Sequence, residues 1–466
     1  MFFELHRMPK HKKKIVEEIF KAPSTVLDKA VRAVEREEKV IGKKKTFRRA
    51  KEFMGALGPG LTTGAADDDP SGIATYSQVG AKLGFQFLWL SVFTFPFMSI
   101  VQEMCARIGL ITGQGLAANI RRHYSRPVLY TIAFLLFIAN TFNIAADLGA
   151  MSAATKLLLP HVPGALLITV FAVFIVALQI FTSYASYAKI LKYMTFALFS
   201  YVLTAFAVHL NWADALRHTV IPSFHFTFDE IFLLSAFLGT TISPYLFFWQ
   251  TAQEVEEEIL KGRKTIALRK TLTNAEEIRS MRQDVWSGMF FSNLVNFFIM
   301  ATCAATLFSH GITTIVSADQ AALALRPFAG DLTYFFFALG IIGTGLLAVP
   351  VLAGSSAYVI AESLQWKQGL FLKLRQARAF YGVIIVSVFI GLIGNFFHID
   401  PIKALIYSAI LNGLISPIVL FFIIRMSSNQ KIMASHTNKP LVTIGGWFIM
   451  CVMAFASVGA IASMFF

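Results

Sequence analysis

Long apolar stretches alternate with short polar segments along most of the chain. A transmembrane helix needs about 20 consecutive apolar residues, so this pattern predicts an all-α polytopic membrane protein. We expect eleven spans, at about 53–82, 85–111, 127–157, 162–182, 187–211, 228–253, 286–309, 331–362, 380–397, 401–426 and 441–465. The intervening polar residues divide the chain into a basic tail at 1–51, spans one to six at 52–253, a charged loop at 254–285 and spans seven to eleven at 286–466.

Two of the expected spans are interrupted by polar residues and a proline. The first contains DDDPSG at 67–72, and the sixth contains GTTISPY at 239–245. Breaks in spans one and six fit a five-plus-five inverted repeat, which places a substrate at mid-membrane between two discontinuous helices. The carbonyls that unwinding frees are tolerated at that depth only where they line a cavity or bind something. A pair of proline kinks without a ligand is the structural alternative, and the adjacent aspartates disfavour it.

Composition supports a membrane protein. The chain has 466 residues, of which 56% are hydrophobic and 15% charged, whereas a soluble domain carries about 25% charge. The first 51 residues are polar and basic, so they do not resemble a signal peptide. The three cysteines, Cys105, Cys303 and Cys451, lie in apolar segments without paired spacing, which indicates neither a disulfide framework nor a zinc site.

The net charge of +14 is a topology signal. With a cytoplasmic N-terminus, 35 of the 41 Lys and Arg residues fall in cytoplasmic segments and five fall on the opposite side. This bias predicts the orientation, and an odd number of spans places the C-terminus outside. We therefore expect an integral plasma membrane protein, such as one of a bacterial inner membrane, with the lipid bilayer and not nucleic acid as its charged partner. The sequence leaves the oligomeric state open and is compatible with a monomer.

Three consecutive aspartates, Asp67, Asp68 and Asp69, are the most unfavourable residues to place in lipid. Each costs roughly 2.5–3.5 kcal/mol at mid-bilayer depth, which a cation in a wet cavity would offset. The two breaks contain carboxylates, hydroxyls and freed carbonyls but no Cys, His or Met, and such hard oxygen ligands suit magnesium, calcium and manganese. We expect Asp69, beside Pro70, to be the direct ligand. Asp67 and Asp68 hold a hydrated ion, attract cations or are paired structurally.

Asn143 and Asp147 lie in the third span. Residues four apart share one helix face. The pair either lines a water path or bridges neighbouring helices by hydrogen bonds, and the sequence favours neither interpretation.

The motifs resemble those of the NRAMP family of divalent-metal transporters over roughly residues 55–426. The resemblance rests on LGPG at 57–60, DP at 69–70, QVGA at 78–81, ARIGLITGQGLA at 106–117 and GTTISPY at 239–245. It implies a LeuT-type fold and transport of a divalent metal into the cytoplasm, without enzyme activity or a cofactor. It also implies carbonyl ligands from Ala66 and Thr240.

Two departures from the family pattern concern metal choice. The family's Asp-Pro-Gly-Asn motif is here Asp-Pro-Ser-Gly, so its asparagine ligand becomes Gly72. The methionine of the sixth span, a soft ligand, becomes Ser243. Losing two side-chain ligands should leave more water on the ion, and replacing sulfur by a hydroxyl favours hard cations. The pattern is similar to the NRAMP-related magnesium transporters, which implies Mg²⁺ as chief substrate and Mn²⁺ as a second one.

Further departures concern protons. The family's acidic third-span positions are here Asn143 and Ala146, and its sixth-span histidine positions are Tyr245 and Gln250. These residues do not titrate near neutral pH. We therefore expect transport that is not proton-coupled and is driven by the membrane potential.

Three alternatives remain at this stage. A proton-coupled Mn²⁺ or Fe²⁺ importer would favour methionine at the position of Ser243. A sodium-coupled amino-acid symporter shares the architecture, but three aspartates would repel the substrate carboxylate. An intramembrane prenyltransferase would need a second aspartate cluster, which the sequence does not contain.

Overall fold

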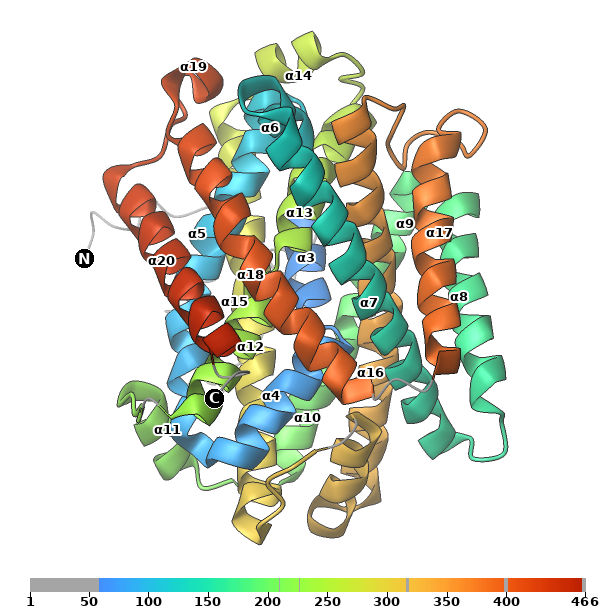
Figure 1. The fold of residues 1–466 in the computed structure, drawn as a ribbon, viewed down its shortest axis with the longest axis vertical. Helices are drawn as coiled ribbons and strands as arrows, with labels where there is room; N and C mark the ends of the chain where they lie inside the picture. The colour runs from blue at the N-terminus through green and yellow to red at the C-terminus, as the bar shows by residue number, and fades with distance from the viewer. Residues whose placement is uncertain (1–57, 209, 226, 316–317, 398–400, 463–466) are drawn as a thin grey trace, which may run out of the picture. The chain divides into compact units, whose positions relative to one another are not determined.

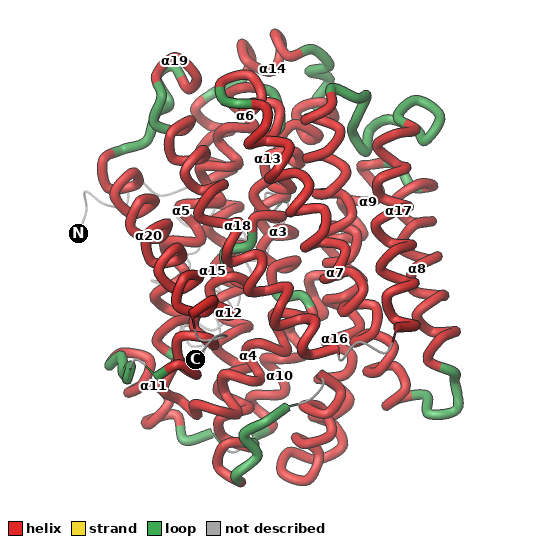
Figure 2. Tube along the Cα trace, in the orientation of Figure 1, coloured by secondary structure: helices red, strands yellow, loops and turns green. Residues whose placement is uncertain are grey.

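The computed structural model describes residues 58–462, apart from 209, 226, 316–317 and 398–400. The elements of this part of the chain are helices, and none of the described residues lies in a strand (Figures 1 and 2). The helices of the bundle are α3 (Pro59–Asp67), α4 (Pro70–Leu83), α5 (Trp89–Thr112), α7 (Arg126–Leu158), α8 (Gly164–Phe181), α9 (Tyr184–Met194), α10 (Phe199–Ala207), α12 (Phe228–Thr241), α13 (Pro244–Leu260), α15 (Ala275–Thr306), α16 (Ala318–Leu364), α17 (Arg378–Gly394), α18 (Pro401–Ser427) and α20 (Pro440–Ala462). Short helices between them are α6 (Leu116–His123), α11 (Trp212–Val220), α14 (Ile266–Leu272) and α19 (Gln430–Met433).

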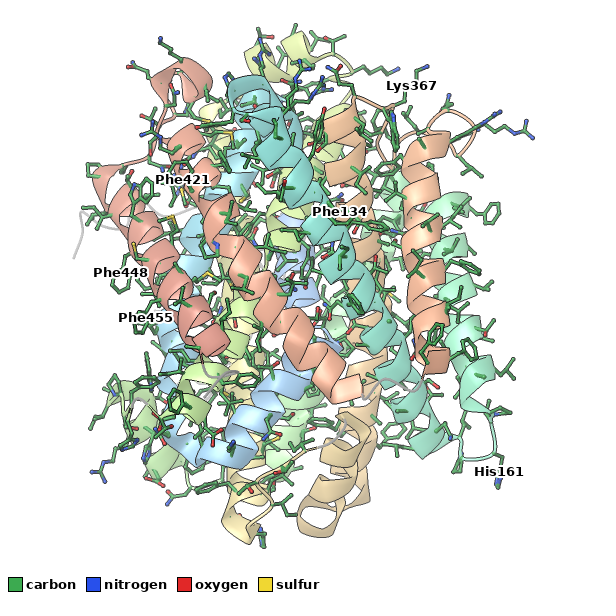
Figure 3. All side chains as sticks on the ribbon, in the orientation of Figure 1. Phe134, His161, Lys367, Phe421, Phe448 and Phe455 are labelled. Carbon is green, nitrogen blue, oxygen red and sulfur yellow. The ribbon has the colours of Figure 1, made fainter. Side chains whose placement is uncertain are left out.

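The helices form a membrane-spanning bundle. Within the described residues, nine helices are long and apolar enough to cross a membrane, or ten if one bent pair counts as a span. Large apolar side chains cover the outside of the bundle, including Phe134, Phe421, Phe448 and Phe455 (Figure 3). Such faces are favourable only against lipid or another apolar surface. The all-α membrane fold is confirmed, whereas the count of eleven spans stays a prediction.

Both expected breaks are present. The first lies at Asp68 and Asp69, between α3 and α4, and the second lies at Ile242 and Ser243, between α12 and α13. Each following helix begins with a proline, which has no N–H to leave unpaired and suits the first helical turn. The half-helices pair crosswise, because α4 packs on α12 and α3 packs on α13. This pairing is the one that an inverted repeat requires.

Helix α15 holds both halves of the first broken helix. It packs along α3, α4 and α5. A Cβ atom on Gly60 would lie 2.5 Å from the Val285 nitrogen, so glycine is required where α3 touches α15. The Asp284 carboxylate of α15 accepts hydrogen bonds from the backbone N–H groups of Gly58, Gly60 and Leu61, at 2.7, 2.7 and 3.2 Å. It thereby caps the beginning of α3.

The basic segments gather at one end of the bundle. The short helices α6, α14 and α19 lie at this end, with the connection from α16 to α17, and α11 lies at the other (Figure 1). The predicted cytoplasmic segments 121–126, 261–282, 367–378 and 425–439 all belong to this end. These segments lie on one side of the bundle, as the charge pattern predicts. That this side faces the cytoplasm stays a prediction.

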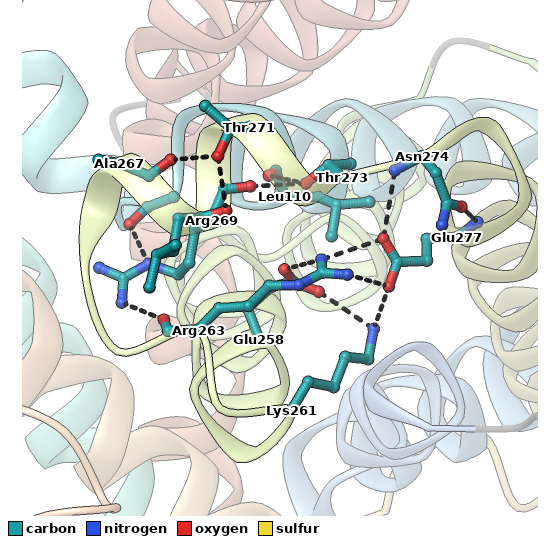
Figure 4. A network of polar contacts seen from close by, with 12 residues as sticks. Leu110, Glu258, Lys261, Arg263, Ala267, Arg269, Thr271, Thr273, Asn274 and Glu277 are labelled. Atoms are coloured by element: carbon teal, nitrogen blue, oxygen red, sulfur yellow. Dashed lines mark hydrogen bonds and ion pairs between the residues drawn. The ribbon is translucent and has the colours of Figure 1, made fainter.

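An ion-pair network fixes the charged connection around α14 (Figure 4). Helix α13 continues through Leu260 and α15 begins at Ala275, so only residues 261–274 lie between them. Glu258 pairs with Lys261 at 3.0 Å and with Arg263, and Glu277 pairs with the same two cations. The hydrogen bonds that Arg263 donates to the Glu277 carboxylate raise the pKa of Arg263 above its ordinary value. The network ties the end of α13 to the beginning of α15.

Candidate metal-binding site

Asp69 is held in place at the beginning of α4. Its Oδ1 accepts hydrogen bonds from the Gly72 N–H at 2.7 Å and from the Ser71 hydroxyl at 2.5 Å. An aspartate at this position satisfies N–H groups that the first helical turn leaves free. Its Oδ2 accepts from the Asn143 side-chain amide of α7 at 2.8 Å. The carboxylate is buried and therefore has a fixed orientation.

The second break presents carbonyl groups instead of a carboxylate. The Ser243 hydroxyl donates to the carbonyl oxygens of Gly239 and Thr240, both at 2.8 Å. These carbonyls belong to the last turn of α12, where a helix leaves its C=O groups without backbone partners. The end of a helix also carries partial negative charge, which favours a cation.

Two contacts join the breaks. The Tyr245 hydroxyl of α13 donates to the Ala66 carbonyl at the end of α3, at 3.0 Å. A Cβ atom on Gly72 would lie 3.4 Å from the Thr240 hydroxyl and 3.1 Å from the Asp67 carbonyl oxygen. The structure thus places Gly72, which donates to Asp69, close to Thr240 of the second break. It also links Ala66 to α13 two residues after Ser243.

Asp68, the sixth proposed residue, has different surroundings. It and Asp67 are fully buried. The Ser292 hydroxyl of α15 donates to Asp67 Oδ2 at 3.3 Å, whereas neither oxygen of Asp68 has a hydrogen-bond partner. Asp69 therefore bonds toward α7, and Asp67 bonds toward α15.

The structure adds residues that the sequence did not assign to the site. Asn143 contacts Asp69 directly, and Asp147, one turn further along α7, is buried beside Asp69 with both oxygens unpaired. Their spacing of four was the available signal. Asn143 makes a hydrogen bond between helices, which was one of the two expectations, and it makes this bond to Asp69. Tyr245 and Ser292 had no comparable signal.

The donor set fits a partly hydrated hard cation. Among the described residues, no group of three or more His, Cys, Asp and Glu side chains is arranged to hold a metal. An ion at Asp69 would therefore take its remaining ligands from carbonyls, hydroxyls and water. Magnesium keeps several waters in such sites.

Two discontinuous helices that meet inside an apolar bundle define the class of secondary transporters with inverted repeats. The family described as Natural resistance-associated macrophage protein-like, or Nramp, matches residues 60–463. The chain belongs to this family, whose members are membrane transporters of metal cations and not enzymes.

Relatives and solved structures agree with this assignment. The divalent metal cation transporter MntH of Klebsiella pneumoniae is 27% identical over 410 residues, which cover 86% of this chain and 92% of that protein. The manganese transporter of Eremococcus coleocola has a similar fold, with a TM-score of 0.67, 18% identity and coverage of 88% and 86% of the two chains. Mhp1, a nucleobase-cation-symport-1 family transporter, has a TM-score of 0.57 and 13% identity, and the match covers 88% and 91% of the chains. These similarities confirm the LeuT-type fold.

Proposed function

We propose that this protein carries divalent metal cations into the cytoplasm, chiefly Mg²⁺ with part of its water shell, and Mn²⁺ as a second substrate. The relatives described above are a divalent metal cation transporter and a manganese transporter, which supports a divalent cation as the substrate. Entry into a negative interior favours a divalent ion by roughly 4.6 kcal/mol per 100 mV.

The observation that carries the preference for Mg²⁺ is that the polar side-chain and carbonyl atoms described at the two breaks are oxygens. Asp69 supplies the carboxylate, and Ser243 occupies the position where the family pattern has methionine. The Ser243 hydroxyl lies against two carbonyl oxygens, so the second break offers only hard donors from this turn. Hard oxygen ligands favour Mg²⁺, and thioether sulfur favours softer metals.

We propose further that protons do not accompany the metal. Of the four positions that correspond to the family's titratable residues, Ala146 has no polar side chain, and the other three make hydrogen bonds through groups that stay uncharged near neutral pH. Asn143 donates to Asp69, Tyr245 donates to the Ala66 carbonyl, and Gln250 donates to Glu254 at 2.9 Å. A proton relay would require groups that change charge in this range.

The second candidate function is a proton-coupled Mn²⁺ or Fe²⁺ importer. One observation favours it: Asp147 is a buried carboxylate beside Asp69 without a hydrogen-bond partner. A sodium-coupled amino-acid symporter is disfavoured because Asp67, Asp68, Asp69 and Asp147 would all repel a substrate carboxylate.

The test is uptake by purified protein in liposomes. Mg²⁺, Mn²⁺ and Ca²⁺ are offered singly and in competition, while a lumenal dye records pH. We expect Mg²⁺ and Mn²⁺ entry without acidification, and no entry for Asp69→Ala. Metal-dependent acidification of the lumen would contradict the absence of coupling, and exclusion of Mg²⁺ would contradict the substrate assignment.

A further inference from the structure

Asp68 is the carboxylate that the site at Asp69 leaves unexplained. Its side chain is fully buried, and both of its oxygens lack hydrogen-bond partners. Asp67 is equally buried and has one unpaired oxygen. No ion pair joins either of them to another described residue. A buried carboxylate is unfavourable unless it is neutralised, hydrogen-bonded or bound to a metal. Asp68 has no partner among the described side chains, and Asp67 has only the Ser292 hydroxyl.

Helix α15 presents further oxygen atoms to these carboxylates. The Ser292 hydroxyl donates to Asp67 and also faces Asp68. Asn296, four residues later, shares this helix face. Its side-chain oxygen is buried and unpartnered, while its nitrogen donates to Asn293 at 3.4 Å. The α15 face therefore supplies a hydroxyl and an amide oxygen with capacity left to bind a ligand.

Glycine contacts fix the register of α15 against the first break. Gly64 of α3 meets Gly288, and Gly80 of α4 meets Met300. The break at 67–69 lies between these two contacts, and so do residues 292–296 of α15. The register therefore brings the two carboxylates and the oxygen-bearing face of α15 to the same level of the bundle.

Helix α10 contributes to the border of this region. Helix α10 packs on α15. The hydroxyl of its Tyr201 is buried and has no hydrogen-bond partner among the described residues. All the unpaired atoms named here are oxygens, which are the ligands of hard cations.

We propose that Asp67, Asp68, Ser292 and Asn296, with Tyr201 at the border, form a second cation site that is distinct from the centre at Asp69. A divalent cation fits best, because two adjacent carboxylates would leave a monovalent ion with an excess negative charge. The site lies on the α15 side of the break, whereas the Asp69 centre lies on the α7 side. This placement goes beyond transport of one ion at one site.

The test counts bound Mn²⁺ on the full-length protein in detergent, by electron paramagnetic resonance of the free ion. We expect two ions per chain for the wild type, and one each for Asp68→Asn and Asp69→Asn. Asp214→Asn, which alters a partly exposed carboxylate on α11, should retain two. One ion on the wild type, or two on Asp68→Asn, would overturn the proposal.

Two further measurements separate a second site from other effects. Ser292→Ala should weaken the second ion about tenfold and leave the first unchanged, which a mere folding defect would not do. Loss of both ions from Asp68→Asn with an unaltered gel-filtration profile would show one shared site and overturn the proposal. Displacement of the second Mn²⁺ by millimolar Na⁺, compared with choline, would overturn its assignment as a divalent site. Asp69→Asn tests the transport site separately, because it should remove only the first ion. Failure of the second site and failure of the transport proposal can therefore be told apart.

Discussion

At the scale of single residues, Ser243 is the position at which we expect the metal preference of the second break to be decided. Ser243→Met replaces a hydroxyl that binds two carbonyls with a thioether, so softer ions gain a ligand and Mg²⁺ gains none. We expect the ratio of Mn²⁺ to Mg²⁺ uptake to rise about tenfold, which corresponds to about 1.4 kcal/mol. Competition uptake in liposomes measures this ratio. Ser416→Ala is the control, since it removes a neighbouring hydroxyl that donates to the Ile242 carbonyl and adds no sulfur. An unchanged ratio in Ser243→Met would contradict the role of this position.

Tyr245 links the two breaks through a carbonyl that is also a candidate ligand. Tyr245→Phe removes the donor to the Ala66 carbonyl and should cost about 1 kcal/mol of folding free energy without metal. A bound ion would satisfy the same carbonyl, so metal should stabilise the variant more than it stabilises the wild type. Thermal unfolding with and without Mg²⁺ gives the two shifts. Tyr381→Phe, which removes a bond to the Leu372 carbonyl elsewhere, should show the wild-type metal shift. Equal shifts in all three proteins would argue against Ala66 as a ligand.

The residues of the candidate site divide into those that the sequence can predict and those that it cannot. The place of Asp69 at the break was predictable from the adjacent proline and the family motif, whereas its role as a metal ligand stays a prediction. The contacts of Asn143 and Tyr245 were not predictable, because they depend on how α7 and α13 pack around the break. The Asp67 side chain bonds to α15 and the Asp69 side chain bonds to α7. This difference follows from the backbone geometry of the break and could not be predicted from the order of the residues.

At the scale of helices, the beginning of α3 depends on a side chain from α15. Asp284→Ala removes the acceptor for three backbone N–H groups and should destabilise this helix end by about 1–2 kcal/mol. We expect faster hydrogen exchange in residues 59–67, measured by mass spectrometry. Asn274→Ala removes the cap of α15 at the same end of the bundle and should leave exchange in α3 unchanged. Slow exchange in α3 of Asp284→Ala would show that glycine packing alone holds the two helices together.

Helix positions were predictable from hydropathy, but helix ends were less so. The apolar span at 228–253 identified the second broken helix, yet α13 continues to Leu260 because its charged last turns are held by Lys261 and Arg263. Hydropathy reports where lipid begins, whereas hydrogen bonds and caps decide where a helix ends. The two breaks indicated an inverted repeat, and the structure adds the crosswise pairing of α4 with α12 and of α3 with α13.

At the scale of the whole molecule, the charge that crosses the membrane distinguishes the two proposed functions. A lone divalent ion carries two charges, so its equilibrium accumulation should change tenfold for about 30 mV of membrane potential. Co-transport of one proton adds a third charge and reduces this value to about 20 mV per tenfold change, if no pH gradient is present. Liposomes with potassium diffusion potentials of several sizes, loaded with valinomycin, give this slope directly. We expect the slope for two charges with both Mg²⁺ and Mn²⁺. Asp147→Asn should keep it, because the proposed mechanism assigns no proton to that carboxylate. If the wild type gave the slope for three charges and Asp147→Asn gave the slope for two, the protein would be a proton-coupled importer. Asp147 would then be its proton-binding residue.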